Sequence, residues 1–222
     1  MRTILVSDPD APRAGVVPPP RRPASRFRPT ARCPLVLLGI VVGAYALVTF
    51  VPMLASAAIP PDSVRSHAFY PTLLPIHAVS GAVALLIASV MISPCRRDFT
   101  PRGHQWLGYV YGGAVALSGP TGLVVATAAD GGWPARIGFI ALGALWMIFT
   151  AAGVRAGIRG ERDAHRRAMT RSVALAFAAV SLRLQNPIFE VLGVPFAIYY
   201  PIVAWTSWAP NLLWAEWRNR RL

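Results

Sequence analysis

The chain has 222 residues, of which 55% are hydrophobic and 14% are charged, and its formal net charge is +13. A soluble domain usually has about a quarter charged residues, so this composition argues against a soluble globular protein. High positive charge is also typical of nucleic-acid-binding domains, but here the arginines stand between apolar runs of membrane-spanning length. The sequence therefore predicts an integral membrane protein whose partner is the lipid bilayer, and it argues against nucleic acid as a partner.

Residues 1–33 are rich in Pro and Arg and show little apolar periodicity. Such a segment cannot bury enough apolar surface to order itself, so a disordered cytoplasmic tail is predicted, followed by a transmembrane domain over residues 34–222. Ala55, Ser56 and Ala57 end the first apolar run and resemble a signal-peptide cleavage site. The apolar core is longer than the roughly 7–15 residues of a signal peptide, which favours an uncleaved anchor and leaves cleavage open.

Six apolar runs make up most of the remaining chain. Each is close to the roughly 20 residues that a helix needs to cross a bilayer core of about 30 Å. The predicted spans are residues 34–58, 72–93, 105–129, 135–154, 168–189 and 196–217. The expected fold class is an all-α integral membrane bundle of about six transmembrane helices.

Arginines mark alternate connections between these runs. Nearly all of them fall in four segments, residues 1–33, 96–102, 155–171 and 218–221. Only Arg65 and Arg136 fall in the other connections, and Arg183 lies within a span. Because cytoplasmic loops carry the excess of basic residues, the pattern predicts that both the N-terminus and the C-terminus are cytoplasmic.

The predicted topology places the four histidines at different depths in the membrane. His67 lies in the first outer loop, His77 lies about one turn into the second span, and His104 and His165 stand at the cytoplasmic starts of the third and fifth spans. Haem b held by two histidines needs two imidazoles at matching depth on facing helices. We therefore consider His104 and His165 as ligands of a haem iron, with His77 as an outer ligand or a quinone contact. The alternative is that His104 and His165 are interfacial anchors.

Arg183 lies near the outer edge of the fifth predicted span, where a charge is costly unless it faces a cavity, a partner or the headgroups. Together with His77, Asn186, Tyr199 and Tyr200 it forms a candidate pocket for an anionic or quinone-like ligand. The alternative is that Arg183 extends to the outer headgroups and binds no ligand.

Asn211 and Glu216 lie near the cytoplasmic end of the last predicted span. An intramembrane carboxylate needs a partner, so Glu216 is expected to pair with Arg166, Arg167 or Arg171. A contribution of Asn211, Glu216 and Arg171 to a ligand site or a proton relay remains an alternative.

Several of these residues belong to one recurring pattern, which runs from about Leu74 to Trp217. It comprises Ile76 and His77; His104, Leu107 and Gly108; His165, Arg166, Arg167, Met169 and Arg171; residues 174–180 with Leu182 and Arg183; and Ala204, Trp205, Trp208, Pro210, Asn211, Leu212, Leu213, Ala215, Glu216 and Trp217. At these residues the sequence resembles a bacterial membrane protein family, domain of unknown function 2306. The resemblance implies a multi-pass protein of the bacterial plasma membrane and no established reaction. In the family Arg usually follows the second histidine, whereas Gln105 stands there in this chain.

Three functions are compatible with these observations, and enzymatic activity and oligomeric state stay open. The first is a small electron-transfer protein that binds haem b or a quinone through His77, His104 and His165. The second is a non-redox protein that binds or moves a small molecule through a polar site around His77, Arg183 and Asn211. The third is a structural or lipid-interacting membrane protein without turnover.

Overall fold

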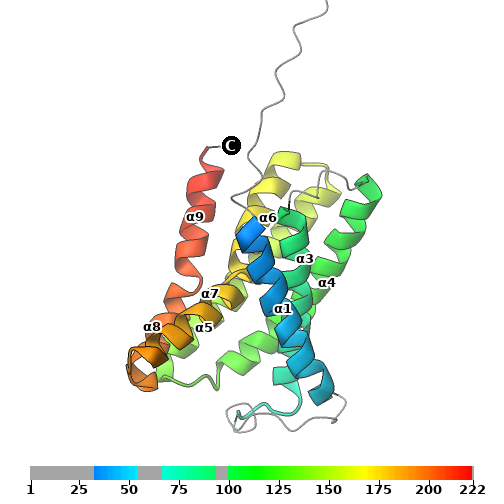
Figure 1. Ribbon diagram of the computed structural model, residues 1–222. Coiled ribbons are helices and arrows are strands. Elements are labelled where there is room, and N and C mark those ends of the chain that lie inside the picture. Colours follow the sequence, from blue (N-terminus) through cyan, green and yellow to red (C-terminus); the bar gives the residue numbers. More distant parts are fainter. Residues whose placement is uncertain (1–32, 55–66, 94–99, 222) are drawn as a thin grey trace, which may run out of the picture.

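The computed structural model describes residues 33–54, 67–93 and 100–221, and over these residues the protein is built from helices joined by turns (Figure 1). The predicted tail over residues 1–33, except for its last residue, lies outside the described residues, as does the candidate cleavage site after the first helix. The helices are α1 (Cys33–Leu54), α3 (Leu73–Ile92), α4 (Pro101–Ala126), α5 (Gly132–Ile158), α6 (Arg162–Ala176), α7 (Ala178–Val191), α8 (Phe196–Thr206) and α9 (Ala209–Asn219).

Five helical segments in the described part of the chain are long and apolar enough to cross a membrane. They are Pro34–Leu54, Leu73–Ile92, Pro101–Ala126, Gly132–Ile158 and Arg162–Val191, the last of which comprises α6 and α7. Large apolar side chains such as Val48, Ile148 and Leu213 are exposed on the outside of the bundle, as a lipid-facing surface requires. The predicted all-α membrane bundle is therefore confirmed.

The sixth predicted span is not one continuous helix. Residues 196–217 fall on α8 and α9, which are separated at Ser207 and Trp208, and Trp208 has a non-helical φ of −124°. Pro210 stands in the first turn of α9. Because proline has no N–H and disfavours helical geometry in the residue before it, the helix is interrupted here.

The two short helices nonetheless pack along the whole length of the bundle. Near the start of α5, the Trp205 indole of α8 donates to the Pro134 carbonyl at 3.0 Å. Near the start of α6, the Asn219 amide of α9 donates to the Arg167 carbonyl at 3.1 Å. Together α8 and α9 therefore extend from one end of the bundle to the other (Figure 1).

Small residues allow α1 to approach the rest of the bundle. A Cβ atom on Gly39 would overlap the hydroxyl of Ser89, and one on Gly43 would lie 2.7 Å from the side chain of Leu86. The same position of Gly39 is 3.1 Å from the ring of Phe177, the residue that joins α6 and α7. The close contact of α1 with α3 therefore depends on these two glycines.

The start of α1 and the end of α9 lie at the same end of the bundle (Figure 1). We call this the Arg-rich end, because Arg155, Arg159 and Arg162 lie there. The opposite end, which we call the Asp130 end, carries the turn between α4 and α5. This arrangement agrees with a chain whose two ends face the same compartment.

Candidate functional site

A partly open cavity of about 350 Å³ lies in the bundle toward the Asp130 end, lined by residues of α1, α3, α4, α5, α6, α7 and α8. Most of its wall is apolar, and it includes Val42, Leu85 and Leu142. The polar or ionisable side chains that line it are His67, His77, Ser118, Asp130, Arg183 and Tyr200. We call it the His77 cavity.

The imidazole of His77 is held in place from α4. Its Nδ1 lies 2.9 Å from the Ser118 carbonyl oxygen and 3.1 Å from the Ser118 hydroxyl, which also contacts the His77 carbonyl at 3.1 Å. Gly122 makes room for the ring, because a Cβ there would lie 2.6 Å from the imidazole. A carbonyl can only accept, so Nδ1 carries the proton in this contact and Nε2 of the neutral ring keeps a lone pair.

Arg183 brings a positive charge to the same cavity from α7. Within the described residues its guanidinium makes one hydrogen bond, from Nη1 to the Ala179 carbonyl of its own helix at 3.3 Å, and no ion pair. A guanidinium has five N–H donors. Most of its donors therefore have no hydrogen-bond partner among the described residues.

Of the other three members of the candidate pocket, one lines the cavity and two do not. Tyr200 lines the His77 cavity and stacks on Phe196, with ring centroids 4.5 Å apart. Tyr199 and Asn186 are not among the lining residues; the Tyr199 hydroxyl donates to Glu190 at 3.3 Å. The structure thus brings together His77, Arg183 and Tyr200.

His104 and His165 lie beside each other at the Arg-rich end. Their ring centroids are 6.2 Å apart and their planes are inclined by 76°. Nδ1 of His165 lies 2.7 Å from the Gly153 carbonyl, and Gly157 leaves room for the ring. This pair is far along the bundle from His77, so the histidines form two separate groups.

The polar residues near the end of the chain have partners of their own. Arg171 donates two hydrogen bonds to the two carboxylate oxygens of Glu216, at 2.5 and 2.8 Å. Asn211 donates to the Ser181 hydroxyl and to the Ser207 carbonyl, each at 3.1 Å. These contacts join α9 and the end of α8 to α6 and α7, and none of the three candidates, Arg171, Asn211 and Glu216, lines the His77 cavity.

Sequence reasoning missed a polar cluster in the middle of the bundle, which we call the Tyr111 network. The Tyr111 hydroxyl lies 2.7 Å from the Ser172 hydroxyl and accepts from the Trp146 indole at 3.1 Å. The Thr150 hydroxyl contacts Ser172 at 2.6 Å and the Trp146 carbonyl at 2.7 Å. The available signal was that Tyr111, Thr150 and Ser172 stand inside three apolar runs, each toward the end that adjoins an Arg-rich segment.

The sequence model of a family described as predicted membrane protein (DUF2306) matches residues 74–218. The chain belongs to this family. No curated protein and no solved structure matches it. The resemblance seen from Leu74 to Trp217 is thereby confirmed, and with it a multi-pass membrane location.

The matched region of this DUF2306 protein contains most of the His77 cavity but not all of it. His77, Ser118 and Arg183 lie within residues 74–218. The part of the wall made by α1, including Gly43 and Phe50, precedes the match. Apart from His67, the polar groups of the cavity are therefore on the family's own segment, while α1 closes one side of it.

Proposed function

We propose that this protein binds a small, largely apolar molecule of the quinone class in the His77 cavity. The observation that carries the proposal is the convergence of His77 and Arg183 on one mostly apolar cavity inside the bundle. Ligand sites are typically apolar cavities of roughly 300–1,000 Å³ with a few placed polar groups. The volume of about 350 Å³ lies at the lower end of that range.

The polar groups match the two oxygens of a quinone and quinol pair. A guanidinium donates strong hydrogen bonds to a carbonyl or an anionic oxygen, which is the contact that Arg183 offers. The Nε2 lone pair of neutral His77 accepts from the hydroxyl of a quinol. Apolar wall residues such as Leu85 and Leu142 suit the ring and its substituents.

The test is the binding of a short-chain quinone to the protein purified in detergent, followed by the shift of its unfolding temperature. Wild type is expected to be stabilised, and Arg183→Gln is expected to lose about tenfold in affinity, since a hydrogen bond to a charged group contributes about 1.5–3 kcal/mol. Arg136→Gln is the matched control, because Arg136 lies at the same end but does not line the cavity.

An apolar carboxylate of similar size is the comparison ligand. Stabilisation by the carboxylate alone would contradict a quinone and favour the non-redox binding function. A quinone that stabilises wild type and both Arg variants equally would show that it binds elsewhere.

A second candidate function, haem b ligation by His104 and His165, rests on the distance between their rings. Two imidazoles that share one iron are separated by about 6 Å between centroids, given a metal–nitrogen distance of about 2.0 Å on each side. The observed 6.2 Å agrees with this value. The contact of His165 Nδ1 with the Gly153 carbonyl is the outer hydrogen bond that a metal-bound histidine usually makes.

The haem candidate is tested by the absorbance of protein expressed with ample haem, before and after reduction with dithionite. A haem band that disappears in both His104→Ala and His165→Ala, but persists in His77→Ala, would support ligation by the pair. The absence of a band in wild type would contradict it and leave the two histidines as interfacial anchors.

A further inference from the structure

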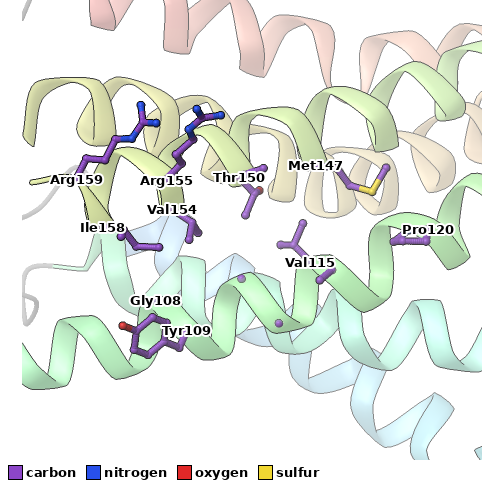
Figure 2. Close-up of a pocket in the computed structure, with 14 residues that line it drawn as sticks. Gly108, Tyr109, Val115, Pro120, Met147, Thr150, Val154, Arg155, Ile158 and Arg159 are labelled. Carbon is purple, nitrogen blue, oxygen red and sulfur yellow. The ribbon is translucent and has the colours of Figure 1, made fainter. Parts of the chain in front are cut away.

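A second hollow lies on the outside of the bundle, between α4 and α5 (Figure 2). It has a volume of about 760 Å³ and shares no lining residue with the His77 cavity. Its floor is formed by small residues of α4, including Gly108 and Gly112. A Cβ atom placed on Gly108 would meet no atom within 4 Å, so the space above it is open. We call this hollow the α4–α5 groove.

The groove is about as long as one half of a membrane. On α4 its lining runs from Gly108 to Pro120, a rise of about 18 Å at 1.5 Å per residue. On α5 it runs from Met147 to Arg159, which is a similar rise. Half of a bilayer core is about 15 Å. The groove therefore has the length of one acyl chain in one leaflet.

The charge in the groove is concentrated at one end. Figure 2 shows the guanidinium groups of Arg155 and Arg159 together at one end, and Met147 and Pro120 at the other. Within the described residues the side chain of Arg155 makes no hydrogen bond or ion pair, and Arg159 lies 4.0 Å from Glu161. Two guanidinium groups thus stand where the apolar groove meets the Arg-rich end, and among the described residues only Arg159 has an acidic partner.

We infer that the α4–α5 groove binds one anionic glycerophospholipid of the cytoplasmic leaflet. One acyl chain lies over Gly108 and Gly112 toward Pro120, and the phosphate contacts Arg155 and Arg159. Basic pockets between transmembrane helices on the cytoplasmic side are suited to anionic headgroups. A lipid chain also fits a surface that is apolar, elongated and open to the side.

A second copy of the chain is the competing occupant, because Gly108 and Gly112 have the spacing of a helix-packing motif. Two copies in one membrane keep the same orientation, so their Arg-rich ends meet at the same depth. Arg155 and Arg159 of one copy would then face like charges on the other, which is unfavourable. An anionic headgroup is attracted to the two arginines instead. The charge of the groove therefore favours a lipid over a second copy of the chain.

The experiment uses the full-length protein purified in detergent and stripped of lipid. Phosphatidylglycerol is titrated against phosphatidylcholine with the same chains and against soluble glycerol phosphate, and unfolding temperature and native mass are measured. We expect one phosphatidylglycerol per chain, a rise in unfolding temperature with that lipid alone, and no effect of glycerol phosphate. The double variant Arg155→Gln/Arg159→Gln should bind about twenty-five-fold more weakly, at roughly fivefold for each Arg near an anionic surface.

The matched control is Arg162→Gln/Arg166→Gln, which removes the same charge from α6 at the same end, outside the groove. It should keep the affinity of wild type. Gly108→Leu should weaken phosphatidylglycerol binding with both groove arginines intact, because the new side chain fills open space. Equal losses in the two double variants, equal stabilisation by both lipids, or a dimer in lipid-free detergent that Gly108→Leu dissociates would overturn the inference.

Discussion

The Tyr111 network and the His77 cavity both place polar side chains inside an apolar bundle. The two regions differ in how far these side chains find hydrogen-bond partners within the protein. In the network, hydroxyl groups from α4, α5 and α6 bond to one another and to the Trp146 indole. In the cavity, His77 is fixed through one nitrogen, and Arg183 makes one long hydrogen bond to its own helix. The first arrangement is complete without a ligand, and the second leaves donors of Arg183 without a hydrogen-bond partner among the described residues.

Trp146 belongs to both regions, since its N–H is part of the network and its ring lines the cavity. The network therefore supports one wall of the cavity. Buried polar groups that are fully paired hold helices in register, whereas polar groups oriented toward a cavity are those expected to meet a ligand. Substitutions in the network should change stability, and substitutions in the cavity should change binding.

The largest effect on stability is expected for Tyr111→Phe. The change leaves the buried Trp146 N–H without its acceptor and removes a partner of Ser172. We expect a loss of about 1–2 kcal/mol in the free energy of unfolding, in line with interhelical hydrogen bonds in membranes. The measurement is a titration with denaturing detergent.

Tyr109→Phe is the control for this substitution. It lies on the same helix, but its hydroxyl is at the exposed surface and accepts only from Gln105 in the described part of the chain. Its stability should stay within about 0.5 kcal/mol of wild type. A similar loss in both variants would contradict a special contribution of the network.

A smaller effect, measured as quinone binding, is expected for Gly122→Ala. The new Cβ would lie 2.6 Å from the His77 ring and would push it away from Ser118. The lost orientation should weaken quinone binding about fivefold, since a typical hydrogen bond contributes about 1 kcal/mol. The displaced ring also loses its hydrogen bonds to Ser118, a cost in stability that the higher helix propensity of alanine offsets in part.

Gly113→Ala is the matched control, because a Cβ at Gly113 meets no atom within 4 Å. It should bind the quinone like wild type. Weaker binding in both variants would mean that a methyl group added to α4 lowers the affinity whether or not it displaces His77.

The long apolar helices could be located along the chain from the sequence. Apolar runs and arginines located the spans, although α4 begins at Pro101 and α6 at Arg162, several residues before the apolar runs predicted at 105 and 168. The reason is that polar residues at an interface continue a helix when their backbone hydrogen bonds can be made there. The break at Ser207 was not predicted, because membrane helices tolerate most prolines, as α4 does at Pro120.

The rotation of each helix and the choice of its neighbours could not be predicted from one sequence. His77 and Arg183 were assigned similar depths, yet depth alone did not show that they line one cavity. Asn186 was assigned to the same pocket and is not in its lining. Ser118, which orients His77, resembles any small residue of an apolar helix, and only the packing of α3 against α4 gives it this contact.

The smallest effect is expected where the polar groups are paired near the surface, at Arg171 and Glu216. Their side chains retain 25% and 37% of their exposure, and pairs of this kind usually contribute less than about 1 kcal/mol because water and salt screen them. Arg171 also lies 5.3 Å from the ring centroid of Phe149, a contact that persists when the carboxylate is removed. A double-mutant cycle with Arg171→Gln and Glu216→Gln should therefore give a coupling energy below about 1 kcal/mol, with quinone affinity unchanged in every variant. A larger coupling energy would mean that this contact, and not the packing of α8 against α5, holds the last two helices in place, whereas a loss of quinone affinity would extend the binding site to the Arg-rich end.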